Sequence, residues 1–100
     1  MDFKNVLGKK CIVRSINAGV FYGTIAEIDD STVELNNARC LWYLSVAASL
    51  NQLAVDGVKN PNSCKFTMLV DEIVIFGVCE ILKTTKTAEK IIEGVEPWTV

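Results

Sequence analysis

Residues 11–28, CIVRSINAGVFYGTIAEI, decide the fold, because they have the pattern of two β-strands joined by a tight turn. We expect strands at 11–16 and 20–28, since both segments are rich in β-branched, aromatic and other apolar residues. Between them Asn17-Ala18-Gly19 supplies the turn, because glycine adopts a positive φ without strain. The sequence therefore predicts a β-hairpin.

Gly23 interrupts the second strand of this hairpin. A glycine inside a strand costs stability, so it indicates a bulge, a sharp bend or the close approach of another backbone. Of these three explanations we favour a bend.

The rest of the first half also predicts β-structure, followed by a helix. We expect a turn at 29–31, a strand at 32–35, a second turn at 36–38 and a strand at 39–44. From residue 45 the apolar side chains recur at helical spacing, with Ser45 as the N-cap and Gly57 at the C-terminal end. This segment predicts an amphipathic helix.

The second half begins with a break at 60–63, NPNS, and continues with two strands and a short helix. Strands are expected at 65–70 and 72–82, on either side of a tight junction at Asp71. The run Ile73-Val74-Ile75-Phe76 predicts burial on both faces, either between sheet and helix or at a subunit interface. Thr84, Thr85 and Thr87 offer hydroxyl caps before a helix at 88–93, which Gly94 and Pro97 end.

These elements define one domain over residues 1–100. The predicted class is α+β and mostly β: a small, strongly bent antiparallel sheet or barrel with one inserted amphipathic helix and a short C-terminal helix. The apolar residues at 68–70 and 73–82 exceed what so small a core can hide, so we also expect a homo-oligomer.

Charge and composition exclude several functions. The formal net charge is −2, whereas proteins that bind duplex DNA carry a basic excess. Histidine is absent, which removes the commonest general base and metal ligand, so we expect no enzyme activity, no metal and no cofactor. The four cysteines form no CxxC pair and are expected to be buried thiols in a reducing compartment. No apolar stretch reaches the ~20 residues that span a bilayer, so we expect no membrane association.

Aromatic residues and arginines favour a ligand-binding role. Phe21-Tyr22 and Trp42-Tyr43 are adjacent pairs on predicted strands, so one ring of each pair should point away from the core and offer a stacking surface. Structural roles are the alternative: Phe21 and Trp42 would fill the core while Tyr22 and Tyr43 cover the barrel rim. For each residue alone we favour the structural role.

Polar residues near these rings complete the candidate site. The only two arginines, Arg14 and Arg39, could grip a phosphate, and Asn37 and Ser49 could read a ligand by hydrogen bonds. The alternative is that the arginines pair with Glu27 or Glu34 across strands. If Arg39 binds ligand, Arg39→Ala should weaken binding and leave the melting temperature almost unchanged.

Several stretches resemble a small family of phage and prophage proteins. They are RSINAGVFYG (14–23), ARCLWY (38–43), AASLNQLAVDGV (47–58), residues 66–81 and GVEPW (94–98). The chain departs from that family at Leu44-Ser45-Val46, where an aromatic residue and a glycine are usual.

This resemblance implies an accessory protein in the cytoplasm of an infected bacterial host. The expected function is a non-enzymatic binding protein that antagonises host defence by sequestering a nucleotide-type immune signal in an oligomer. The alternative is an anti-CRISPR-like inhibitor that binds a host defence protein or nuclease complex directly. The aromatic residues and arginines favour the first.

Overall fold

The predicted hairpin forms the centre of the sheet. The computed structural model describes residues 5–43, 49–58 and 64–98. In it β1 (Lys10–Ser15) pairs antiparallel with β2 (Gly19–Asp29), and Gly19 takes a φ of 102° at the turn. The remaining elements are β3 (Thr32–Tyr43), α1 (Leu50–Asp56), β4 (Lys65–Phe66), β5 (Val70–Ile75), β6 (Val78–Lys83) and α2 (Lys86–Glu93).

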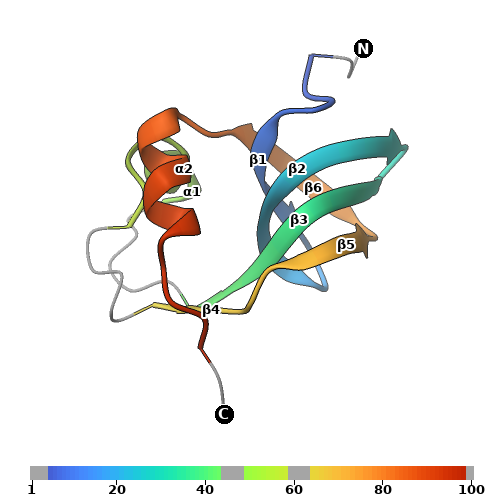
Figure 1. Cartoon of the computed structure of the whole chain (residues 1–100). Helices are drawn as coiled ribbons and strands as arrows, with labels where there is room; N and C mark the ends of the chain where they lie inside the picture. The colour runs from blue at the N-terminus through green and yellow to red at the C-terminus, as the bar shows by residue number, and fades with distance from the viewer. Residues whose placement is uncertain (1–4, 44–48, 59–63, 99–100) are drawn as a thin grey trace.

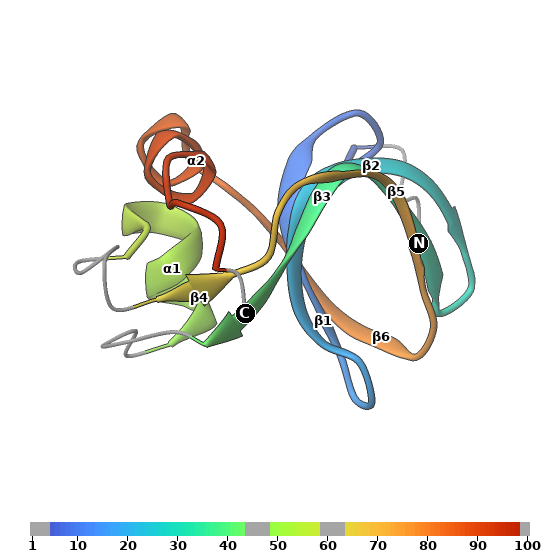
Figure 2. The same ribbon diagram turned by 60° about the horizontal axis from the view of Figure 1, so that its bottom comes forward.

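The strands curl into a ring with the two helices packed beside it. The sheet order is β4-β3-β2-β1-β6. β5 and β4 pair with the same edge of β3, β5 along its first half and β4 near its C-terminal end. All of these pairings are antiparallel. Figure 2 shows β1, β2, β3, β5 and β6 around the ring, whereas α1, α2 and β4 lie to one side. The predicted α+β, mostly β class is confirmed.

The sheet has a hydrophobic core on each face. Phe21 and Val13 belong to the cluster inside the ring, whereas Tyr22 and Ile12 belong to the cluster that also contains residues of α1 and α2. Figure 1 shows the two helices together on one side of the sheet. Neighbouring residues on a strand point to opposite faces, and here both faces are covered. The expectation that one ring of the Phe21-Tyr22 pair points away from the core is therefore wrong.

The predicted turn at 36–38 is also wrong, because β3 runs through it without a break. Asn36 pairs with both Thr24 and Glu72, and Ala38 pairs with Val70. Asn37 keeps a turn-like φ of 49° inside the strand. Backbone pairing on both edges of β3 thus overrides the local preference of two asparagines for a turn.

The apolar second half is divided differently from the prediction. β4 covers only Lys65–Phe66, and the expected strand at 72–82 is two strands, β5 and β6, that meet at Phe76-Gly77. Gly77 has a φ of 70°, which marks the turn. Ile75 is buried, whereas Val74 and Phe76 are 51% and 69% exposed, so the run is not covered on both faces within this chain.

Both predicted helices form, with caps close to those expected. The N-cap of α1 is Ser49, whose hydroxyl accepts a hydrogen bond of 3.1 Å from the Gln52 N–H; Ser45 lies outside the described residues, as does the break at 60–63. Gly57 ends α1 as predicted, with a φ of 75°. Thr85 caps α2, which ends at Gly94.

The cysteines are four free thiols in different surroundings. Cys11 and Cys64 are buried as expected and Cys40 is half-buried, but Cys79 is exposed on β6, contrary to prediction. Burial raises the pKa of the Cys11 thiol to about 11, so this thiol stays protonated and unreactive near neutral pH. No helix in the described part of the chain is long and apolar enough to cross a membrane.

Gly23 lies where β2 curves over β3. The register of β2 against β3 shifts between Tyr22 and Thr24, and β2 is visibly arched (Figure 2). A Cβ atom added at Gly23 would lie 2.9 Å from the Cβ and 3.2 Å from the Cα of Ala38. The close approach of another backbone therefore accompanies the bend.

We predict that Gly23→Ala lowers the free energy of unfolding by about 1–3 kcal/mol, because the new methyl group overlaps Ala38. Chemical denaturation measures the change. In a double-mutant cycle, Ala38→Gly should lose less stability in the Gly23→Ala background than alone, since it removes the clashing atom. If the two substitutions had additive effects on the free energy of unfolding, the close contact with Ala38 would not be the reason that residue 23 is glycine.

Candidate functional site

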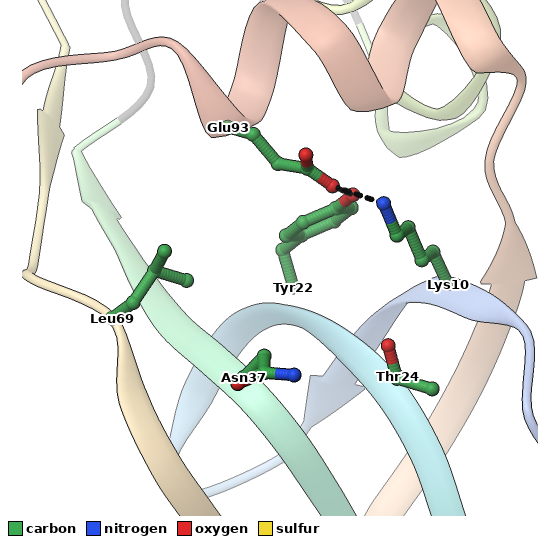
Figure 3. Close-up of a pocket in the computed structure, with 6 residues that line it drawn as sticks. All are labelled: Lys10, Tyr22, Thr24, Asn37, Leu69 and Glu93. Atoms are coloured by element: carbon green, nitrogen blue, oxygen red, sulfur yellow. Dashed lines mark hydrogen bonds and ion pairs between the residues drawn. The ribbon is translucent and has the colours of Figure 1, made fainter.

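A cavity of about 220 Å³ opens between the sheet and the C-terminal end of α2. Four elements and the segment before β5 contribute to it, and its side chains converge from both layers (Figure 3). The lining residues are Lys10, Tyr22, Thr24, Asn37, Leu69 and Glu93.

Glu93, the last residue of α2, makes polar contacts with two other residues that line this pocket. Its carboxylate accepts a hydrogen bond from the Tyr22 hydroxyl and lies 2.8 Å from the Lys10 ammonium (Figure 3). The Tyr22 ring is 1% exposed, so the hydroxyl is held in place by the core beneath it. Sheet and helix are thereby joined by a three-residue polar network.

These contacts move the pKa values of all three groups away from neutrality. Burial disfavours the Glu93 carboxylate, but hydrogen bonds from Lys10 and Tyr22 outweigh it and lower the Glu93 pKa. The pKa of Lys10 is raised, chiefly by its hydrogen bond with Glu93. Burial, followed by the Glu93 contact, raises the pKa of Tyr22. Near pH 7 each group therefore keeps one protonation state.

The local charge balance determines what the pocket can hold. Glu89 adds a second negative charge close enough to raise the pKa values of Lys10 and Tyr22. A phosphate entering here would meet the Glu93 carboxylate, the nearby negative charge of Glu89, and an ammonium already paired with Glu93. The pocket thus suits a small neutral or cationic polar ligand, with Thr24 and Asn37 as further hydrogen-bonding groups.

Of the seven predicted site residues whose side chains the structure describes, two line this pocket, Tyr22 and Asn37. Phe21 lies in the inner core, and Ser49 is the cap of α1. Arg14 is exposed and its Nε donates to Glu80 Oε1 at 2.9 Å, so the expected pairing with Glu27 or Glu34 is wrong.

Trp42 and Tyr43 end β3. Trp42 is 60% exposed, so the alternative that it fills the core is wrong. It stacks on Trp98, with ring centroids 5.0 Å apart. The Tyr43 side chain lies outside the described part of the structure.

Arg39 has a structural position instead of the predicted ligand contact. It is 2% exposed; its Nε donates to the Thr67 carbonyl at 2.7 Å and its Nη1 to the Ile92 carbonyl at 3.0 Å. The guanidinium carbon lies 5.5 Å from the centre of the Phe66 ring. Desolvation lowers its pKa, and among the described residues Nη2 has no hydrogen-bond partner. No phosphate can reach this group from solvent.

Sequence reasoning missed four of the pocket residues: Lys10, Thr24, Leu69 and Glu93. Lys10 and Glu93 lie near opposite ends of the chain, so no local pattern connects them. One signal was present: a carboxylate in the last turn of a helix is opposed by the helix dipole, which indicates a compensating cation. In the described residues no three His, Cys, Asp or Glu side chains gather as a metal site.

The architecture defines a small α+β domain, a strongly bent, open antiparallel sheet with a helical layer. The chain belongs to the family described as Domain of unknown function (DUF6948), whose model matches residues 8–92. No curated protein and no solved structure matches the chain. The matched range includes β1 through most of α2. The phage origin that the sequence resemblance implies stays a prediction.

We predict that Arg39→Ala lowers the free energy of unfolding by about 2–4 kcal/mol, because two hydrogen bonds to a charged donor are lost and a cavity remains above Phe66. This replaces the expectation of an unchanged melting temperature. Thermal denaturation measures it, with Arg14→Ala as the matched control for the exposed arginine. Equal melting temperatures for the two variants would contradict the structural role.

We predict that Glu93→Gln removes part of the acid-side pH dependence of stability. The folded pKa of Glu93 is lowered, so its stabilisation is complete above the ordinary pKa of 4.5 and disappears as the pH falls through the folded value. Denaturation curves across the acid range test this. Glu96→Gln, at an exposed carboxylate three residues on, is the control and should keep the wild-type profile.

Proposed function

We propose that this protein is a non-enzymatic binding protein that works as a homo-oligomer, with the β5 edge as the surface on which a second copy docks. The observation that carries this proposal is a row of exposed apolar side chains along an unpaired strand edge. These side chains, which we term the β5 edge patch, are Met68, Leu69, Val70, Val74 and Phe76, each between 41% and 69% exposed.

Two strands of the ring leave an edge available. Among the described residues β5 pairs only with β3, and β6 only with β1, although a short turn joins β5 to β6. An unpaired strand edge presents a row of backbone N–H and C=O groups, and a strand from another chain can bond to them. A second copy of this chain offers the complementary edge.

The side chains of β5 favour burial against that copy. Val70 and Val74 share one face of β5, with the charged Glu72 between them, and Phe76 follows directly after the strand. Phe76 also lines an apolar hollow of about 310 Å³ at the end of the ring, together with Phe21. Exposed apolar patches beside a binding edge are typical of protein interfaces.

Leu69 connects this edge to the pocket. It is 50% exposed in the β5 edge patch and also lines the cavity that contains Glu93. A second copy seated on the patch would therefore border the pocket entrance. This supports a ligand site shared between two copies, as expected of a protein that sequesters a small molecule.

The protonation states in the pocket support binding without catalysis. A general base or acid works best when its pKa lies near the working pH. Here the pKa of Glu93 is lowered while those of Tyr22 and Lys10 are raised. The network is therefore better suited to fixed hydrogen bonds than to proton transfer.

In the setting that the resemblance implies, such an oligomer would counter host defence by stoichiometric binding. The electrostatics of the pocket favour a neutral or cationic part of a ligand there, not its phosphate. The alternative role, direct inhibition of a host defence protein, would use the same β5 edge patch for a different partner.

Light scattering on the purified protein tests the oligomer. We expect a multiple of the 11.0 kDa chain mass for the wild type and 11.0 kDa for Val74→Lys, because the substitution would place a charge in an apolar interface, where its desolvation is costly. Val55→Lys, at an equally exposed valine on α1, is the matched control and should assemble normally.

A wild-type mass of 11.0 kDa at every concentration would overturn the homo-oligomer. If the monomer then captured a defence protein from a host, and Val74→Lys abolished this capture, the β5 edge patch would serve the alternative role.

A further inference from the structure

We propose that Trp42, Trp98 and Lys65 form a second binding site, which takes a nucleotide by stacking its base on an indole and holding its phosphate at the ammonium. We term these three residues the tryptophan platform. The two indole rings are stacked, with an angle of 15° between their planes. The site lies at the β3–β4 end of the sheet and shares no residue with the β5 edge patch, so it goes beyond the proposed oligomer and can be tested without it.

Backbone contacts fix the position of both rings. Trp42 follows Leu41, which pairs with Phe66 of β4. The N–H of Trp98 donates to the Phe66 carbonyl at 2.8 Å, and Pro97 forms a parallel bridge with Phe66. Because Phe66 is buried in the core, both tryptophans are anchored to the same rigid point. A preorganised stacking surface loses little entropy when a ligand binds.

The rings are exposed although they are the largest apolar side chains in the protein. Trp42 is 60% and Trp98 40% exposed, while each ring covers one face of the other. An indole with one face covered and more than half its surface accessible has its second face open. The outer face of Trp42 is therefore available to a flat ligand.

Lys65 determines which flat ligand fits. Its Nζ lies 5.4 Å from the centroid of the Trp42 ring and 5.1 Å from that of Trp98. The platform thus already contains a cation held by its own aromatic rings, which disfavours a cationic guest such as a methylated lysine. An anionic group on the ligand would instead be attracted to the ammonium. An aromatic base that carries a phosphate has both required features.

The geometry also separates this ligand from a proline-rich peptide. Peptides in the polyproline conformation dock into grooves between separated aromatic rings. Here the rings are stacked on each other, 5.0 Å between centroids, so they leave no groove between them. A planar base needs only an open ring face.

Intrinsic fluorescence provides a direct test, because the chain has two tryptophans and both belong to the platform. We expect AMP to quench the tryptophan emission with saturation, and adenosine, which lacks the phosphate, to bind more weakly. Lys65→Gln should weaken AMP binding roughly tenfold and leave adenosine binding almost unchanged. Lys83→Gln, on β6 at the other end of the sheet, is the matched control.

A single-stranded oligoadenylate distinguishes a free nucleotide from a nucleic-acid strand as the ligand that supplies the base and the phosphate. Quenching by AMP supports a free nucleotide as ligand, and quenching by the oligonucleotide alone supports a single strand; either outcome supports the platform. No quenching by any of them would overturn it. Equal binding of AMP by wild type and Lys65→Gln would overturn the role of the ammonium. Thermal denaturation of each variant confirms that it is folded, and Trp98→Phe provides a second variant that keeps an aromatic ring.

Discussion

A buried guanidinium, which has no carboxylate partner among the described residues, holds the two layers of this protein together. Arg39 extends from β3 to the last turn of α2, where it bonds the Ile92 carbonyl. Helix carbonyls near the C-terminus carry the negative end of the helix dipole, so they compensate the charge that burial leaves unscreened. The next residue along α2 is Glu93. The position of Glu93, and with it the polar pocket, therefore depends on the hydrogen bond between Arg39 and Ile92, although neither residue lines the pocket.

The same side chain organises the segment that leads to β5. Arg39 bonds the Thr67 carbonyl, while the Thr67 hydroxyl and N–H pair with the backbone of Cys40. This fixes the chain between β4 and β5, so Leu69 faces the pocket and the β5 edge patch begins at a defined place. The Phe66 ring lies against the guanidinium, and its backbone anchors Trp98. The segments that carry the β5 edge patch and the tryptophan platform are thus both held in place by contacts with the buried Arg39 side chain.

The fold was predictable wherever local chemistry decides it. Gly19 and Gly57 need a positive φ, and Thr85 caps a helix, so these boundaries follow from a few neighbouring residues. Prediction failed where distant partners decide. Asn36 and Asn37 remain in a strand because β2 and β5 flank them, and Tyr22 is buried because α2 covers a face that the strand pattern alone leaves open. Of the candidate site, Tyr22 and Asn37 were predictable, but the contact between Lys10 and Glu93 was not.

The pairing of β1 with β6 has a consequence for how the chain folds. Cys11 pairs with Lys83, so one edge of the first strand lacks its partner until the chain up to Lys83 has left the ribosome. Closing so long a loop is entropically costly, and sheets with such distant pairings fold slowly. During synthesis the β1–β2–β3 meander would exist first, with its apolar inner face uncovered. The competition between correct sheet formation and aggregation would then be decided by how soon β6 becomes available to pair with β1.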